Sequence, residues 1–260
     1  MMKAKLYNKT EYADLNRELY DDKETIRLNK YISESGVASR WEADRMIEVG
    51  RIKVNGKVAV VGTKIKADDV VTLDNKVITP KTTKIYLALN KPAGIVSTTD
   101  TAIDGNMTTF MDYKEKIFPI GRLDKDTTGL ILLTNDGDIV NKILRVENGH
   151  DKEYIVEVNK DITDDFIEQM TQGVMIYNPV THQNQRTLPA DIQQIANRKF
   201  KLIIRQGLNR QIRRMCDALG YKVESLERIR IMHIHLGDLP IGYYRYLTQT
   251  EIEKLNELMN

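Results

Sequence analysis

The sequence predicts an α+β protein: a small N-terminal domain of two helices and three strands, and a larger domain built on a mixed, mainly antiparallel β-sheet flanked by helices. Three observations support this class. Residues 28–73 follow the order helix, helix, strands. Beyond residue 84, short apolar strand patterns alternate with helix patterns, and no G-x-G-x-x-G phosphate loop is present. A polar stretch with Pro80 separates the two parts.

We therefore divide the 260 residues into a charged extension at 1–24, a first domain at 25–75, a linker at 76–83 and a second domain at 84–260. The extension has no clean hydrophobic period, and we expect it to be mobile or peripherally helical.

The first domain is predicted from caps and a turn. Leu28 begins one helix and Gly36 ends it, and Ser39 begins a second helix that Gly50 ends. Ser39 and Glu42 have the spacing of a capping box. The Asn55-Gly56 dipeptide between apolar residues predicts a hairpin with a type I′ turn, and residues 70–73 supply a further strand.

The second domain is predicted from apolar runs and their boundaries. Leu130–Leu133 is an apolar run between Gly129 and the turn-forming Asn135-Asp136-Gly137, which is typical of a buried strand. Other strands are expected at residues 85–90, 154–158, 200–204 and within 221–236, and helices at 139–146, after Thr163, at 207–215 and at the acidic C-terminus.

Composition limits the function classes. At 41% hydrophobic residues the chain can bury a core, and a single cysteine, Cys216, excludes an internal disulfide and a Cys-rich zinc site. No apolar stretch reaches about 18 residues, and the charged first 24 residues do not resemble a signal peptide. We expect a soluble, cytoplasmic protein.

The net charge says little about the binding partner, whereas the distribution of charge along the chain says more. The net charge is +2. Residues 27–66 nevertheless contain nine basic and four acidic side chains, and residues 205–230 contain seven and three. Such local excesses favour a nucleic-acid partner.

The most informative segment is Gly121–Gly137, which places Arg122 and Asp124 just before the buried strand. A carboxylate on a loop held by a rigid element is a typical position for a catalytic group. Its opening also matches a calcium loop, but the twelfth position is Asn135 where a bidentate Glu is required, so calcium is rejected. An isolated Arg-Leu-Asp tripeptide would more often be a surface pair.

The whole seventeen-residue segment resembles the signature of RNA pseudouridine synthases, specifically the RsuA family, which modifies ribosomal RNA and carries an N-terminal RNA-binding module. The resemblance implies that Asp124 is catalytic and that Arg122 helps to extrude the target nucleotide. Asn90-Lys91-Pro92-Ala-Gly94 resembles a second family segment, a strand and turn beneath the active site, and Lys91 is expected to contact RNA.

Two further resemblances complete the expected site. Gly207–Met215 resembles the family segment whose Arg after Gln-Ile pairs with the catalytic Asp, here Arg213, while Arg210 and Arg214 on the same helix are expected to face RNA phosphates. Tyr154 matches the Tyr that stacks on the target uracil. The catalytic set is thus Asp124, Tyr154 and Arg213.

The first domain resembles the alpha-L RNA-binding module. The resemblance implies that basic side chains of its helices and hairpin contact RNA phosphates: Arg27, Lys30, Arg40, Arg45 and Lys53. An ordinary helical pair with a solvated basic face is the alternative. Relatives usually have Arg where this chain has Trp41. Two interpretations are open for this indole, stacking on a base and packing into the core, and we favour packing.

The implied reaction isomerises uridine to pseudouridine. The nucleotide is flipped into the pocket, Asp124 acts at the sugar, and the detached uracil rejoins through C5. The sequence leaves open whether Asp124 attacks C1′ or removes the 2′ proton. No metal or organic cofactor is expected, and His150, His182, His233 and His235 are interpreted as structural or surface residues.

The segments Arg27–Gly36 and Gly207–Cys216 look most similar to the branch of this family acting on 23S ribosomal RNA near the peptidyl-transferase centre. The expected partner is ribosomal RNA, with a tRNA anticodon loop as a second substrate, and the protein is expected to be a monomer. Two alternatives remain: a non-catalytic ribosome-associated factor, and a nucleoside hydrolase that would need a second carboxylate such as Asp126.

Overall fold

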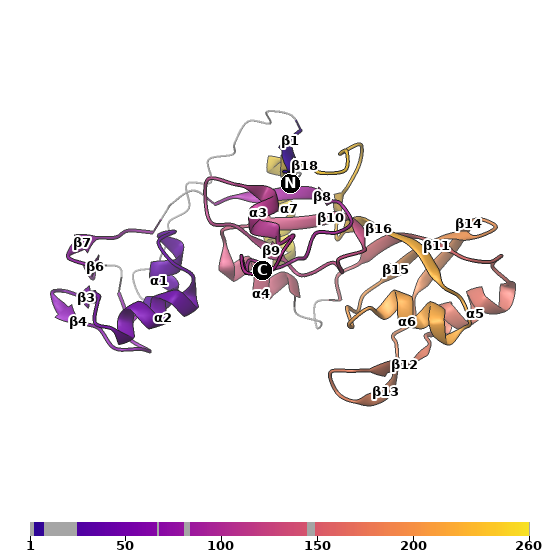
Figure 1. Cartoon of the computed structure of the whole chain (residues 1–260), viewed down its shortest axis with the longest axis horizontal. Helices are drawn as coiled ribbons and strands as arrows, with labels where there is room; N and C mark the ends of the chain where they lie inside the picture. Colours follow the sequence, from indigo (N-terminus) through magenta and orange to yellow (C-terminus); the bar gives the residue numbers. More distant parts are fainter. Residues whose placement is uncertain (1–2, 8–24, 67, 81–83, 145–148, 260) are drawn as a thin grey trace. The chain divides into compact units, whose positions relative to one another are not determined.

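The computed structural model describes residues 3–7, 25–66, 68–80, 84–144 and 149–259. The chain divides into two compact units, one over residues 13–85 with 114–116, the other over residues 1–12, 86–113 and 117–260. Each is described by itself (Figure 1). No helix among the described residues combines the length and apolar character needed to cross a bilayer.

The smaller unit contains two helices and two small antiparallel sheets. The helices are α1 (Leu28–Glu34) and α2 (Arg40–Glu48). A four-stranded sheet has the order β4-β3-β6-β7, and β2 pairs with β5. The strand bounds are β2 (Ile26–Arg27), β3 (Ile52–Val54), β4 (Lys57–Val58), β5 (Lys64–Ile65), β6 (Val71–Leu73) and β7 (Lys76–Val77).

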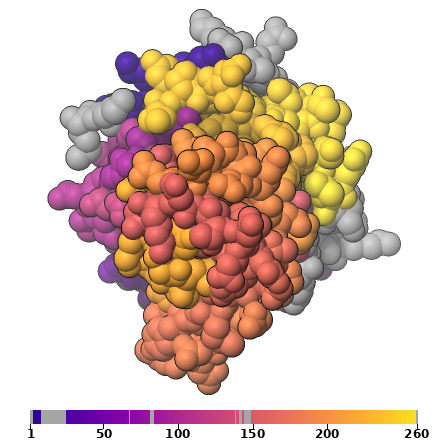
Figure 2. Space-filling view, turned by 90° about the vertical axis from the view of Figure 1, so that its right-hand side faces the viewer, coloured from indigo at the N-terminus to yellow at the C-terminus, as the bar shows by residue number. Residues whose placement is uncertain are grey.

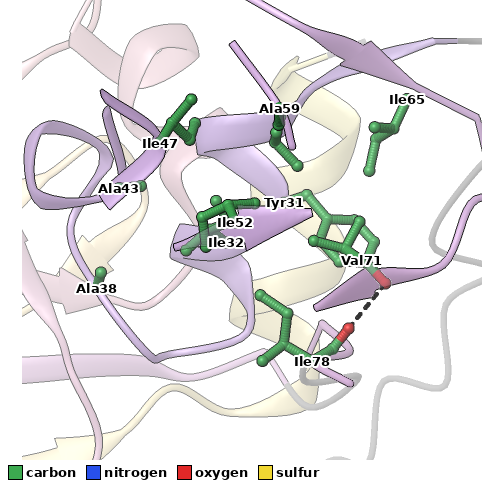
Figure 3. Close-up of a cluster of buried hydrophobic side chains, with 11 residues drawn as sticks. Tyr31, Ile32, Ala38, Ala43, Ile47, Ile52, Ala59, Ile65, Val71 and Ile78 are labelled. Atoms are coloured by element: carbon green, nitrogen blue, oxygen red, sulfur yellow. Dashed lines mark hydrogen bonds between the residues drawn. The ribbon is translucent and has the colours of Figure 1, made fainter. Parts of the chain in front are cut away.

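Its local signals were predicted correctly. Ser39 and Glu42 form both hydrogen bonds of the capping box on α2. Asn55 and Gly56 both have positive φ, 50° and 79°, as a type I′ turn requires. The unit closes on one apolar core in which the Tyr31 hydroxyl donates to the carbonyl of Ile78 at 3.2 Å (Figure 3).

The larger unit is built on a ten-stranded mixed sheet with the order β1-β18-β8-β10-β16-β11-β15-β14. Strand β9 also pairs with β10, and β17 with β16. Only β1–β18 and β10–β16 are parallel among the described pairs, so the sheet is mainly antiparallel, as predicted. The bounds are β1 (Lys5–Leu6), β8 (Tyr86–Lys91), β9 (Phe118–Ile120), β10 (Thr128–Thr134), β11 (Lys152–Val158), β14 (Asp191–Ala196), β15 (Lys199–Ile204), β16 (Val223–Ile231), β17 (Ile234–His235) and β18 (Tyr243–Tyr246).

Helices and one hairpin surround this sheet. The helices are α3 (Met107–Met111), α4 (Gly137–Leu144), α5 (Asp164–Gln172), α6 (Gln211–Ala218) and α7 (Gln249–Met259). Helices α5 and α6 lie along the part of the sheet that contains β11, β14 and β15 (Figure 1). The rings of Phe166 on α5 and Phe200 on β15 meet edge to face at 5.4 Å. The hairpin of β12 (Met175–Asn178) and β13 (Gln183–Arg186) projects from this end (Figure 2).

Three sequence predictions need correction. Residues 5–6 of the extension form an edge strand beside β18, where Lys5 pairs with Tyr243; residues 8–24 lie outside the described residues. Helix α4 begins at Gly137 rather than at residue 139, and residues 145–146 of the expected helix also lie outside the described part. Helix α6 begins only at Gln211, because its N-cap, Arg210, has the left-handed backbone conformation, with φ 49°.

Candidate active site

A cleft of about 360 Å³ in the larger unit collects all three predicted catalytic residues and two of the predicted RNA-binding residues. Asp124 and Arg122 come from the loop between β9 and β10, Tyr154 from β11, and Arg210 and Arg213 from the start of α6. These residues are up to 91 positions apart in the sequence, since 213 − 122 = 91, and the sheet brings them to one place.

Hydrogen bonds to the backbone hold the Asp124 loop on both sides of Asp124. The Ser97 hydroxyl donates to the carbonyl of Leu123 at 2.9 Å and accepts from its N–H at 3.1 Å. The Gly94 N–H donates to the carbonyl of Lys125 at 2.8 Å. The Asp124 side chain is 30% exposed and faces the cleft, so a substrate can reach a carboxylate whose backbone is fixed.

Lys91 contributes to this support instead of contacting RNA as predicted. It is fully buried, and its ammonium donates to the carbonyls of Pro92 at 2.9 Å, Ile95 at 2.9 Å and Lys125 at 3.3 Å. Burial lowers its pKa to about 8, while the carboxylates of Asp126 and Asp124 act in the opposite direction. A lysine with three carbonyl acceptors and no exposed surface cannot reach a phosphate, so that prediction was wrong.

A glycine fixes the start of β10 behind the loop. Gly129 pairs with Arg228 across the parallel β10–β16 contact, and its φ is +98°. A Cβ at this position would lie 2.3 Å from the carbonyl oxygen of Arg228. Only glycine combines this close approach with this backbone conformation.

The ion pair of Asp124 differs from the predicted one. The guanidinium Nη1 of Arg210 lies 3.8 Å from Asp124 Oδ2, whereas Arg213 Nη1 donates to the carbonyl of Val223 at 3.3 Å. The left-handed backbone of Arg210 places it before the helix, while Arg213 lies in the first turn of α6 beside β16. Arg213 still lines the cleft, and its Nε is buried without a hydrogen-bond partner among the described residues.

Tyr154 is 7% exposed, and its side chain lines the cleft. A shift in the β11–β16 register falls between Glu153 and Tyr154, where the pairing passes from Arg230 to Arg228. Such an irregularity redirects a side chain at a sheet edge or an active site. The ring therefore adds an aromatic surface to a cleft whose lining also includes isoleucine and leucine side chains, such as Ile120, Leu123 and Ile204.

Several cleft residues were not predicted. Arg228 is buried, its Nε donates to the carbonyl of Leu130 at 2.7 Å, and its Nη2 has no hydrogen-bond partner among the described residues. Burial lowers the pKa of Lys152, and Arg228 lowers it further. His150 also lines the cleft, and burial lowers its pKa. Charged residues within a strand pattern, as in Leu226-Glu-Arg228, were the available signal.

The charge of the cleft is strongly asymmetric. Six of its lining residues are Lys or Arg, and Asp124 is the single acidic residue among the described residues that line it. The cationic residues are Arg122, Lys152, Arg205, Arg210, Arg213 and Arg228. Such a cleft attracts a polyanion and presents one carboxylate to it. Asp126 is exposed and is not part of the lining, so the part of the cleft that the structure describes holds no second carboxylate of the kind that a hydrolase needs.

Arg214 lies on α6 beside the β12–β13 hairpin. It is half-buried, and its guanidinium donates to the carbonyl of Tyr177 on β12 and to the Asn209 side chain. It thus attaches the β12–β13 hairpin to α6. Its expected role in phosphate binding stays a prediction.

On the smaller unit, Arg27, Arg40 and Arg45 are exposed. Lys30 Nζ lies 3.8 Å from Glu34 Oε1, and Lys53 donates to the Asn75 side chain at 2.9 Å. All five expected phosphate contacts therefore lie at or near the surface of this unit.

Trp41 is 67% exposed, so the expectation that it packs into the core was wrong. The core face of α2 is formed by Ala43 and Ile47, and Trp41 lies on the opposite side of the helix.

Comparisons with known proteins found matches to both parts of the chain. A sequence profile described as RNA pseudouridylate synthase matches residues 85–218, and a profile of the S4 domain matches residues 26–71. The chain is 49% identical over 237 residues to a dual-specificity RNA pseudouridine synthase RluF of Escherichia coli O6:H1, covering 90% of this chain and 80% of that protein.

Two other similarities span nearly whole proteins. The ribosomal large subunit pseudouridine synthase B of Bacillus subtilis is 34% identical over 241 residues, covering 89% of this chain and 96% of that protein. A crystal structure of a pseudouridylate synthase superposes with a TM-score of 0.64 and 32% identity, covering 88% of this chain and 99% of that one.

Proposed function

The chain belongs to the RsuA family of RNA pseudouridine synthases with an S4 domain, and from this premise we propose that it isomerises a uridine of 23S ribosomal RNA near the peptidyl-transferase centre. One relative is named for the large ribosomal subunit. Another is named a dual-specificity enzyme, and we include a tRNA anticodon loop as the second substrate.

The observation that carries the mechanism is that one carboxylate stands among many cations in the described lining of the cleft. Asp124 is the acid that faces the cleft, the Tyr154 ring lies in the same cleft, and six Lys and Arg side chains surround them. RNA phosphates are attracted by the cations, an extruded uracil can stack on the tyrosine, and the ribose is then presented to the carboxylate.

In this mechanism Arg122, exposed at the cleft edge, holds the phosphate of the extruded nucleotide. Flipping costs a few kcal/mol, which the stacking and phosphate contacts offset. Support for this role is positional: Arg122 is two residues from Asp124 on the same loop.

Asp124 then acts at the sugar by one of two routes. As a nucleophile it bonds to C1′, and the electrons of the N1–C1′ bond leave with uracil; the rotated uracil rejoins through C5 and displaces the carboxylate. As a base it removes the 2′ proton while the N1–C1′ bond breaks, which gives a glycal and a uracil anion; C5 then bonds to C1′ and a proton returns to C2′. Either route ends with loss of the C5 proton and protonation of N1, so no oxidant or reductant is required.

Substrate choice is testable with transcripts that lack pseudouridine. The protein is incubated separately with 23S rRNA, 16S rRNA and tRNA transcripts, and pseudouridine is mapped by carbodiimide-dependent stops of reverse transcriptase. We expect a stop in 23S rRNA near the peptidyl-transferase centre, and a weaker one in a tRNA anticodon loop.

Asp124→Asn should give no stops on any of these RNAs. Modification confined to 16S rRNA would contradict the proposed substrate while leaving the enzyme class intact. If 23S rRNA is modified only in assembling subunits, the proposed position in 23S rRNA is retained, and the substrate is the assembling subunit instead of naked RNA.

A further inference from the structure

The exposed indole of Trp41 is the feature of the smaller unit that neither its core nor its phosphate contacts explain. Trp41 is 67% exposed on α2, and it is the only tryptophan of the chain. Ala43 and Ile47 on the opposite side of the helix are buried, so the indole adds nothing to the core. A large aromatic ring left in water on an RNA-binding domain indicates a binding surface.

One face of the indole is already occupied. The guanidinium carbon of Arg45 lies 4.9 Å from the centre of the Trp41 ring, a cation–π contact between residues four apart on the helix. This contact limits rotation of the ring and places a positive charge beside it. With two-thirds of the residue's surface exposed, a flat ligand can stack on the indole next to that charge.

We propose that Trp41 and Arg45 form a binding site for an unpaired base of the RNA substrate, in which the base stacks on the indole and Arg45 contacts the adjoining phosphate. This inference rests on the proposed function for the nature of the substrate. Base–aromatic stacking tolerates any base, because every base has a π face, and an arginine beside the ring adds to it. Unpaired nucleotides are also the parts of folded RNA whose bases are accessible to side chains.

Charge favours RNA over a protein partner. Residues 27–66 carry five more basic than acidic side chains, and the exposed Arg40 is the immediate neighbour of Trp41. The central residues of protein–protein interfaces are depleted of charge, whereas RNA-binding grooves combine aromatic rings with cations. The charged surroundings of this indole match the second pattern.

The site would contact a nucleotide other than the target uridine, because the target must reach Asp124 in the larger unit. Loss of the indole should therefore weaken RNA binding and leave the chemical step on bound RNA unchanged. It should also leave the salt dependence of binding unchanged, since stacking releases no counterions. Loss of Arg45 should reduce the slope of log K against log salt by about one phosphate contact.

The sole tryptophan makes this directly measurable. The full-length Asp124→Asn protein, which binds without turnover, is titrated with single-stranded oligouridylate and with a blunt RNA duplex of the same length while the Trp41 fluorescence is recorded. Filter binding measures affinity independently. We expect strong quenching by the single strand and little by the duplex.

Variants of Trp41 separate stacking from other effects. In filter binding, Trp41→Phe should bind the single strand within about twofold of the parent, and Trp41→Ala should bind about 10-fold more weakly with the same salt slope. Val77→Ala, which shortens another exposed apolar side chain of the unit, is the matched control and should bind like the parent. Melting curves establish that each variant is folded.

Unchanged fluorescence at saturating single-stranded RNA, together with parental affinity of Trp41→Ala, would overturn the proposal. Quenching by intact ribosomal subunits but not by their extracted RNA would overturn it as well, and would assign the indole to a protein contact. If the protein modifies no RNA at all, the proposed function fails, but these binding results remain interpretable because they require no turnover.

Discussion

The two units use basic side chains in opposite ways. On the smaller unit, Arg27, Arg40 and Arg45 are exposed at the surface. In the larger unit, Lys91 and Arg228 are buried and donate to backbone carbonyls near the cleft. Exposed cations supply charge that another cation can replace, whereas buried ones fix the geometry of a loop or strand.

This difference predicts that substitutions in the two units act on different quantities. Changes in the smaller unit should alter RNA affinity and its salt dependence. Changes to the buried and half-buried residues beside the cleft should alter stability and turnover.

The largest effect is expected at Gly129. Gly129→Ala would place a Cβ 2.3 Å from the carbonyl oxygen of Arg228 and force a positive φ on alanine. The free energy of unfolding should fall by about 3 kcal/mol or more. Urea denaturation measures this loss. Gly56→Ala in the smaller unit is the control for positive φ alone, because nothing lies within 4 Å of the new Cβ there. If both variants lost the same free energy of unfolding, the close contact between β10 and β16 at Gly129 would not be the cause of the loss.

Arg213→Ala should lower the single-turnover rate by about 100-fold, because removing one charged hydrogen-bond donor from a desolvated site has effects of this order. Its effect on RNA affinity should be small, since Arg213 is half-buried. Arg210 is exposed and lies 3.8 Å from Asp124, and Arg210→Ala should affect affinity more than the rate. The reverse pattern would give Arg210 the role that the family resemblance assigns to Arg213.

Lys91→Met should lower the free energy of unfolding by roughly 1–3 kcal/mol, because it leaves buried carbonyls without their donor. The difference in the free energy of unfolding between the wild type and Lys91→Met should increase as the pH rises. Burial lowers the pKa of Lys91 in the folded protein to about 8, whereas its pKa in the unfolded chain is about 10.4. Between these two pH values the unfolded wild-type chain binds more protons than the folded one. The free energy of unfolding of the wild type therefore rises with pH in this range. Denaturation of both proteins between about pH 7 and 10 tests this, and a constant difference would contradict the burial of the ammonium.

The smallest effects are expected for single phosphate contacts on the smaller unit. Arg27→Ala should weaken RNA binding only a few-fold at moderate salt, reduce the salt slope by about one, and leave the single-turnover rate unchanged. Arg27→Lys should restore most of the affinity, since the expected contribution is charge. A large rate defect in Arg27→Ala would abolish the distinction between the two units.

Features with local signals could be predicted from the sequence. The capping box of Ser39 and Glu42, the Asn55-Gly56 turn and the apolar run before Asn135 each depend on neighbouring residues, and all three hold in the structure. The resemblance also selected Asp124, Tyr154 and Arg213, which the fold brings to one cleft.

Features that depend on tertiary contacts could not be predicted from the sequence. Lys91 has the composition of a surface residue, and only the turn and loop around it supply its three acceptors. The left-handed backbone of Arg210 delays α6 in a segment with a helical pattern. The β12–β13 hairpin was missed because Gln183–Arg186 has neither alternation nor high strand propensity.

The central claim is that the Asp124 carboxylate performs the isomerisation, and its most direct test is the single-turnover rate of pseudouridine formation at saturating 23S rRNA. Asp126→Asn is the matched control, since it removes an exposed carboxylate from the same loop. Asp124→Asn should bind RNA normally and lower the single-turnover rate by about 10²–10⁴-fold. Asp126→Asn should keep a rate near that of the wild type. Comparable rates for Asp124→Asn and the wild type would contradict the account.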